Sequence, residues 1–160
     1  MPLSDFSIIN SVFGKLKADS TFLAYFGLTT ASTMPDIVKK IQKEIDPDGL
    51  TTANIPLCCI YPIPGVRSRI NGCVYDGMFE VAIYSDSSSG VKTATQKAGT
   101  MVIGELLSGD LAKGKIGLLH QVQLAGATFL TEYQGGFQTS SGVSGIKKYI
   151  QRYKVSEEIG

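Results

Sequence analysis

The sequence has no tryptophan, one histidine and three cysteines among its 160 residues. A single histidine excludes every site that needs two imidazoles, including the H-E-x-x-H zinc motif. The odd cysteine count, with Cys58 and Cys59 adjacent, argues against a disulfide framework, and Cys73 creates no zinc-ligand spacing. We therefore expect free thiols, with Cys58 and Cys59 on opposite faces of one strand, and neither a metal nor a cofactor.

Charged residues are also few: they make up 18% of the chain, and the formal net charge is +1. A net charge this small gives no long-range attraction to nucleic acid or to an acidic membrane surface. The apolar runs are far shorter than a membrane span, and residues 1–5 lack the basic and apolar parts of a signal peptide. These absences predict a protein that is made in the cytoplasm and has no membrane partner.

The length and the 43% apolar content fit one globular domain over residues 1–160. Neither a linker nor a change of composition divides the chain, and no internal repeat is found. Eighteen glycines indicate many turns and loops between the elements of this domain.

Three helices are predicted in the first third of the chain, each from a capping residue followed by an apolar stripe of helical spacing. They cover residues 4–16, 22–26 and 33–45. Asp19 precedes the second helix and Gly27 ends it. The turn Asp46-Pro47-Asp48-Gly49 ends the third helix; it resembles part of a calcium loop but lacks the remaining oxygen ligands.

Strands are predicted from alternating apolar residues in the rest of the chain. They cover residues 55–63, 66–71, 73–85, 118–124, 128–133 and 146–155. Asn71-Gly72 is a hairpin signal between the second and third strands. Prolines restrict the first strand to an edge or a short central piece. Residues 134–141 are rich in Gly, Ser and Thr, and we expect them to form a loop, as we expect residues 111–117 to do.

A serine-rich corner over residues 86–90 leads from the strand over residues 73–85 to a helix over residues 91–106. The order of helices, strands, one helix and further strands is typical of the α+β class. We expect an antiparallel or mixed sheet that helices cover on one face, in a single domain.

The serine corner has two interpretations. A strand that passes through a Gly/Ser loop into a helix could cradle a phosphate, but this corner lacks the lysine and flanking glycines of a P-loop, and Lys92 has the wrong spacing. Ser88 or Ser89 acting as a helix N-cap explains the composition without a ligand. His120 has no nucleophile motif beside it, so the sequence singles out no catalytic residue.

Basic residues concentrate on the last strand, at Lys147, Lys148, Arg152 and Lys154, with tyrosines between them. Such interleaving occurs on some nucleic-acid-binding surfaces. Lysines also occupy solvated strand faces and protect sheet edges from pairing. Contact with a partner protein, or the lining of a channel, is a third use of the same charges.

Four motifs follow one another along the chain. They are D-x-x-F-L-x-x-F-G at residues 19–27, I-P-L-C-C-I-Y-P at residues 55–62, Y-D-G-x-F-E-V-x-I-Y-S at residues 75–85 and K-Y-x-Q-R-Y-x-V at residues 148–155. This order resembles the tail terminator, or tail-completion, proteins of long-tailed bacteriophages over nearly the full chain. The chain departs from that pattern by the helix over residues 33–45 and an extended segment over residues 109–126.

The resemblance implies a non-enzymatic structural protein of the phage tail that forms a hexameric ring. Such a ring caps the growing tail tube, ends its polymerisation and provides the surface that joins the tail to the head, while DNA passes through its lumen without sequence recognition. The implied partners are copies of this chain, the tail tube protein and a head connector or neck protein, and the implied location is the head-proximal end of the tail in the virion. A head-completion or neck connector protein is the alternative; a small ligand-binding domain or enzyme that uses the serine corner is a further one.

Uncharged loops suit contacts that become ordered on assembly. We expect residues 134–144 and the corner over residues 86–90 to contact neighbouring subunits or the tube, and the basic last strand to line the lumen or a subunit contact. The candidate contact residues are Asp86, Ser88, Gly90, Gly135, Gly136, Phe137, Lys148, Arg152 and Lys154.

Overall fold

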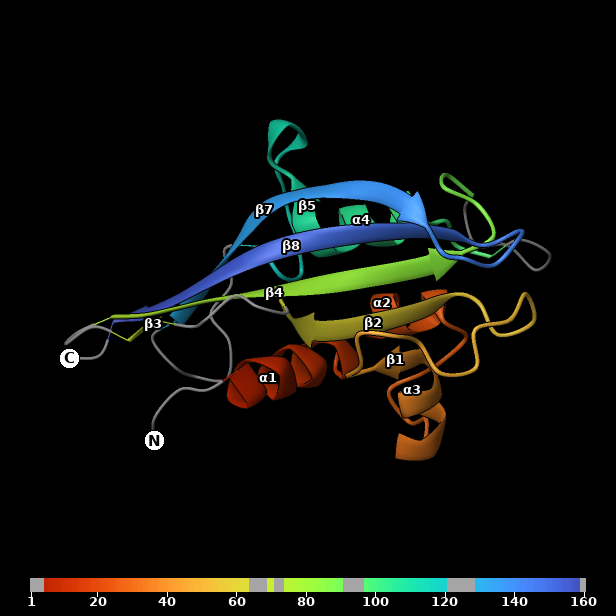
Figure 1. Cartoon of the computed structure of the whole chain (residues 1–160), viewed down its shortest axis with the longest axis horizontal. Helices are drawn as coiled ribbons and strands as arrows, with labels where there is room; N and C mark the ends of the chain where they lie inside the picture. Colours follow the sequence, from red (N-terminus) through yellow and green to blue (C-terminus); the bar gives the residue numbers. More distant parts are fainter. Residues whose placement is uncertain (1–4, 64–68, 71–73, 91–96, 121–128, 159–160) are drawn as a thin grey trace.

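The computed structural model describes residues 5–63, 69–70, 74–90, 97–120 and 129–158. Its centre is a six-stranded sheet in the order β1-β2-β4-β8-β7, with β3 also paired to β4 (Figure 1). The strands are β1 (Ile41–Gln42), β2 (Leu57–Pro62), β3 (Arg69–Ile70), β4 (Val74–Ser85), β7 (Phe129–Ser140) and β8 (Lys147–Glu158). Only β1 and β2 are parallel among these pairs. The sheet is therefore mixed, and the expected α+β class is confirmed.

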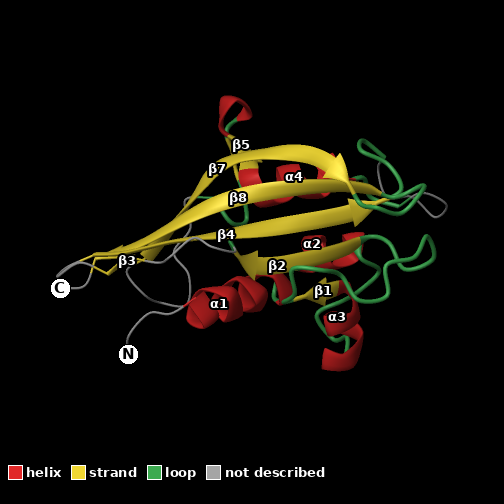
Figure 2. Cartoon of the chain, in the orientation of Figure 1, coloured by secondary structure: helices red, strands yellow, loops and turns green. Residues whose placement is uncertain are grey.

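Helices cover one face of this sheet, as Figure 2 shows. α1 (Asp5–Lys17), α2 (Ser20–Tyr25) and α4 (Thr100–Ser108) share a buried core with the strand residues that point toward them. α3 (Met34–Lys40) lies beside β1 and contributes Ile37 to the same core. Within that core the rings of Phe79 and Tyr153 stack with their centroids 5.2 Å apart. Burial of such a side chain stabilises the fold by about 2 kcal/mol.

Both ends of α2 are capped, and Gly27 ends the helix as the sequence predicts. The Asp19 carboxylate accepts a hydrogen bond of 2.8 Å from the backbone N–H of Phe22. Gly27 has φ +74°, and the next residue, Leu28, donates its N–H to the carbonyl of Leu23 at 2.9 Å. This is the Schellman arrangement, which satisfies carbonyls that a helix end otherwise leaves free.

The third helix is shorter than the predicted span of residues 33–45, because the chain joins the sheet after Lys40. Ile41 and Gln42 pair with Cys58 and Cys59, and this pairing competes with continued helix. Both residues are buried, and the Gln42 amide bonds the backbone of Asp48 in both directions, at 2.9 and 2.7 Å. Thus β2 is a central strand, flanked by β1 and β4, which agrees with one of the two predicted placements.

The helix predicted from residue 91 begins only at Thr100, and its N-cap is Gly99, so Ser88 and Ser89 do not cap it. The serine corner provides backbone carbonyls, and not serine hydroxyls, as hydrogen-bond acceptors for the first N–H groups of α4. Thr100 and Met101 donate their N–H groups to the carbonyls of Ser87 and Ser88, at 3.0 and 2.8 Å. These N–H groups are therefore not free to bind a phosphate, contrary to the first interpretation of the corner.

The segment predicted as a loop over residues 134–141 is mostly strand, because β7 continues to Ser140 in register with β8. A register shift between Tyr133 and Gly135 marks a bulge, and Gly135 has φ +124°. Glycine suits this position because other residues rarely adopt a positive φ. Gly/Ser-rich composition is therefore compatible here with a long strand that has a local irregularity.

Residues 111–117, expected to form a loop, are part of a hairpin: β5 (Gly109–Asp110), a 3₁₀ turn η1 (Leu111–Lys113) and β6 (Lys115–Ile116). Leu118 to His120 follow as a bend and not as the predicted strand. Residues 64–68, 71–73, 91–96 and 121–128 lie outside the described residues. They include most of the predicted strands over residues 66–71 and 118–124, the Asn71-Gly72 hairpin signal, Cys73 and Lys92.

Candidate assembly surface

Side chains of β8 alternate between the two faces of the sheet. Tyr149, Gln151, Tyr153 and Val155 are buried under the helices. The intervening residues of β8, from Lys148 to Lys154, face the opposite side. This opposite side therefore holds all three basic candidates, Lys148, Arg152 and Lys154.

The opposite side is itself partly covered by a second apolar cluster. Its members are Ile55, Leu57, Cys59, Tyr61, Ala82, Tyr84, Ile146 and Ile150, with Leu50 packed against them. Cys58 belongs to the helix-covered core and Cys59 to this second cluster, so the two thiols lie on opposite faces as predicted. The part of this side formed by β7 and the outer half of β8 carries exposed residues: Glu132, Phe137, Arg152 and Lys154. We call that part the open face.

Two of the three basic candidates have partners within the chain. Arg152 donates from Nε and Nη2 to one oxygen of Glu80, at 3.2 and 2.9 Å. Lys148 places its Nζ 5.4 Å from the centroid of the Tyr84 ring, within the range of a cation–π contact. Lys154 is exposed and stands opposite Glu132 in the β8–β7 register. The open face is therefore less basic than the sequence of β8 suggests.

The serine corner and the end of β7 meet at one end of the sheet. Gln138 donates from its amide nitrogen to the Ser88 hydroxyl at 3.1 Å. Gly90 accepts a bond of 2.7 Å from the N–H of Gly99, and Asp86 is exposed beside it. The structure thus brings Ser88 beside Gln138 at the end of β7, whereas Gly135 lies opposite Arg152, two residues from Lys154 on β8.

Gly136 lies where the helix-covered side of β7 packs against two tyrosines. A Cβ at this position would lie 2.6 Å from Cζ of Tyr149 and 2.9 Å from the Tyr133 hydroxyl. The two tyrosine hydroxyls are 3.2 Å apart. Gly136 therefore makes room for a tyrosine pair within the subunit, whereas Phe137, which is 50% exposed, is available for a contact outside it.

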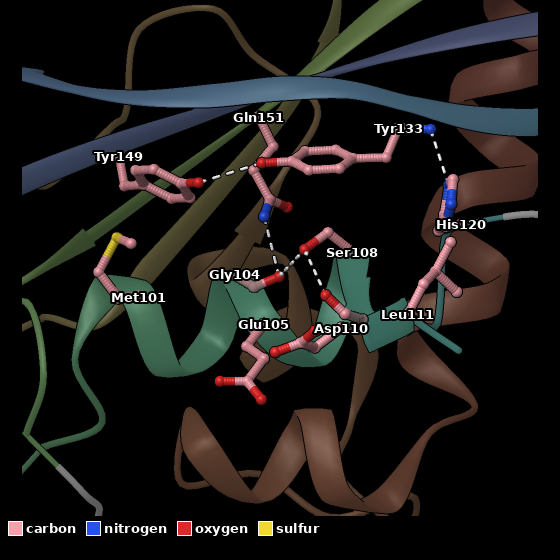
Figure 3. A pocket seen from close by; sticks show the side chains of 11 residues that line it. Met101, Gly104, Glu105, Ser108, Asp110, Leu111, His120, Tyr133, Tyr149 and Gln151 are labelled. Carbon is pink, nitrogen blue, oxygen red and sulfur yellow. Dashed lines mark hydrogen bonds between the residues drawn. The ribbon is translucent and has the colours of Figure 1, made fainter. Parts of the chain in front are cut away.

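A pocket of about 420 Å³ lies between α4 and these tyrosines (Figure 3). The Gln151 amide spans its floor, donating to the carbonyl of Gly104 at 2.8 Å and accepting from the Tyr153 hydroxyl at 2.7 Å. Burial raises the pKa of Tyr133, and its hydrogen bond with Tyr149 acts in the same direction. This polar cluster was not predicted from the sequence. The one sequence feature that points to it is Gly104, a glycine inside an apolar helix.

His120 closes one side of the same pocket. Its Nδ1 accepts a bond of 2.9 Å from the backbone N–H of Tyr133, and the ring is buried. That bond occupies a backbone donor of β7, the last strand of the described sheet. The histidine thus serves the fold by holding the bend at residues 118–120 against β7.

Within the described ranges, no group of three or more His, Cys, Asp or Glu residues is arranged to hold a metal ion. None of the described helices is both long and apolar enough to cross a bilayer. No protein-family model matches the chain, and no curated protein sequence matches it.

Proposed function

We propose that this chain is a ring-forming structural protein of a phage tail that caps the tail tube, ends its polymerisation and provides the head-joining interface. The observation that carries the proposal is the one-sided construction of the sheet. Helices cover one face, and β4, β8 and β7, each of twelve residues, extend together across the molecule. At about 3.3 Å per residue these strands form a wall roughly 40 Å long. Copies of such a wall, side by side, would enclose a channel.

The open face suits the lumen of that channel. DNA that must pass through a ring is held back by strong, evenly spaced positive charge, because each phosphate contact adds affinity. On the open face Arg152 is neutralised by Glu80, and Lys154 stands opposite Glu132. The remaining charge is small, which favours passage of DNA without binding.

A neck connector or head-completion protein would use the same ring and the same open face, and it differs only in its partner. Purified protein incubated with tail tubes and, separately, with portal complexes distinguishes the two. Co-sedimentation with tubes supports the tail terminator; co-sedimentation with portals alone supports the neck protein. A protein that stays monomeric both alone and on tubes contradicts the proposal.

A ligand-binding domain or enzyme built on the serine corner is tested by the double substitution Ser88→Ala and Ser89→Ala. For a structural subunit the substitution should affect at most the assembly contacts of the corner. Loss of a small-molecule activity with assembly intact would favour the ligand-binding alternative.

A further inference from the structure

The outer edge of β7 is open over its last residues. Within the described chain β7 pairs with β8 alone, whereas β1, at the other end of the sheet, is two residues long and lies beside α3 (Figure 1). The bond from the Tyr133 N–H to His120 covers the edge at that residue. The bulge that follows ends at Gly135, and all residues from Gly136 to Ser140 are exposed. We call residues 136–140 the free edge.

Alternation along the strands shows which backbone groups of the free edge point away from β8. The N–H of Ile63 bonds to the carbonyl of Met78, so even-numbered residues of β4 face β2 and odd-numbered residues face β8. On β8 the even-numbered residues then face β7, and the register pairs them with odd-numbered residues of β7 beyond the bulge. The N–H and carbonyl groups of Gly136, Gln138 and Ser140 therefore point outward, and within the described chain no other backbone group is bonded to them on that side.

The free edge carries none of the side chains that usually protect a strand edge from pairing. Residues 134–140 contain neither a charged residue nor a proline. Phe137, 50% exposed, adds an apolar side chain on the open face. An exposed edge of this kind is a template for pairing with another extended strand, because its N–H and carbonyl groups are already aligned.

A second copy of the free edge is complementary to the first. Gly136, Gln138 and Ser140 are evenly spaced about Gln138, so an antiparallel copy centred there pairs Gln138 with Gln138 and Gly136 with Ser140. Each such pair exchanges two hydrogen bonds, which gives about six bonds in all. Since the segment carries no charge, no like charges face each other across the pair.

The same register brings exposed apolar side chains together at both ends of the paired segment. The turn after Ser140, which carries Val143, comes level with Tyr133 of the second copy. Leu111 lines the same pocket as Tyr133, and η1, which carries Leu111, stands out beyond β7 (Figure 1). Val143 is 39% exposed and Leu111 is 54% exposed. Burial of these side chains adds a hydrophobic contribution that a strand pair alone lacks.

We propose that two copies of the chain pair through the free edges of β7, in an antiparallel two-fold dimer centred on Gln138. Such a contact uses the same surface on both copies and is isologous. It goes beyond the proposed function, because a ring with one face toward the tube and the other toward the head is polar and needs a different contact. The dimer is thus a form of the protein outside the ring, and it covers Gly136 and Phe137.

Gln138→Pro and Gln138→Ala form a matched pair of variants. Both remove the side-chain bond to Ser88, but only proline removes the backbone N–H that points outward. The β7–β8 pairing does not use that N–H, so circular dichroism should show a folded chain in both. By analytical ultracentrifugation the wild type and Gln138→Ala should be dimers. The dissociation constant of Gln138→Pro should be at least about tenfold higher, because the central pair of bonds is lost.

Equal dissociation constants of the two variants would overturn the contact, and so would a wild type that stays monomeric at every concentration. Hydrogen exchange that protects the free edge only when a different protein binds a monomeric chain would also overturn it.

Disulfide formation tests the register without the proline variant. In the proposed dimer Phe137 of one copy lies directly opposite Thr139 of the other, with Cβ atoms about 5 Å apart, whereas two copies of either residue are diagonal neighbours at about 7–8 Å. An oxidised equal mixture of Phe137→Cys and Thr139→Cys should therefore form disulfide dimers faster than either variant alone. The wild type measures the background from the chain's own cysteines. A mixture that forms no more dimer than the separate variants would contradict the register.

These experiments use the chain without tail tubes, so they separate this inference from the proposed function. A monomeric chain that forms rings on tubes would overturn the dimer and leave the proposed function in place. A dimer with the expected response to proline, in a protein that does not cap tubes, would support the β7 contact while the proposed function fails.

Discussion

The carboxylate of Glu80 and the guanidinium of Arg152 form a two-donor contact across β4 and β8, where the two residues are also register partners. The Glu80 side chain is only 10% exposed, whereas that of Arg152 is 45% exposed. Tyr61 is the register partner of Glu80 on β2. Burial raises the pKa of Tyr61, and the charge of Glu80 raises it further. A row of interacting side chains thus crosses three strands of the sheet.

Arg152→Met should destabilise the subunit by about 2–3 kcal/mol, because it leaves a buried carboxylate without its partner. Urea unfolding followed by circular dichroism measures the loss. The double variant Glu80→Gln with Arg152→Met should lose less than the sum of the two single changes. Additive losses would show that the pair is not coupled.

Gly136→Ala should cost about 2 kcal/mol, because its Cβ would overlap the Tyr149 ring and separate the tyrosine pair. Gly14→Ala is the control: nothing lies within 4 Å of a Cβ at Gly14 in the middle of α1. There alanine should stabilise the protein by about 0.5–1 kcal/mol. Thermal unfolding of both variants should therefore shift in opposite directions, and a shift in the same direction would contradict the packing described for β7.

His120→Leu should lower the unfolding free energy by about 1–2 kcal/mol, because the backbone N–H of Tyr133 loses its acceptor. His120→Asn should retain most of the stability, since an amide oxygen is able to accept the same bond. Equal stability of the leucine variant and the wild type would mean that the bond does not hold the bend against β7.

Alkaline pH should destabilise the fold through its buried thiols. Burial raises the pKa of Cys59 to about 12, and burial also raises the pKa of Cys58. An acidic group whose pKa is raised by folding stabilises the folded state fully at low pH, and that stabilisation is lost as pH rises from the unfolded value toward the folded one. Between about pH 9 and pH 12, Cys59 should therefore contribute a loss of up to about 1.4 kcal/mol per pH unit.

Urea titrations at successive pH values measure this slope in the wild type and in Cys59→Ala. The alanine variant should show a shallower fall in stability above pH 9, although its stability at neutral pH is lower. An unchanged slope would contradict the assignment of the loss to Cys59.

Sequence patterns correctly predicted the helices and strands whose conformation is determined by residues within the same segment. Examples are α2, which Asp19 and Gly27 cap from adjacent positions, and β4 and β8, whose side chains alternate between the two faces of the sheet. The α+β class followed from the order of such elements. The opposite faces of Cys58 and Cys59 followed from the period of a strand.

The errors occur where a distant segment decides the outcome. Ile41 leaves its helix because β2 provides a pairing edge, and α4 begins late because the corner carbonyls take up its first N–H groups. Pairing with β8 likewise turns residues 134–140 into strand. The cluster around Gln151 joins β7, β8 and α4, so no single stretch of sequence contains it. The candidate contact residues remain predictions.

Electron microscopy of the purified protein with isolated phage tail tubes tests the proposed capping role. If the protein caps the tube, we expect a closed ring at one end of each tube, and tubes whose length no longer grows when tube protein is added. Tubes with bare ends that continue to elongate in the presence of the protein would contradict it.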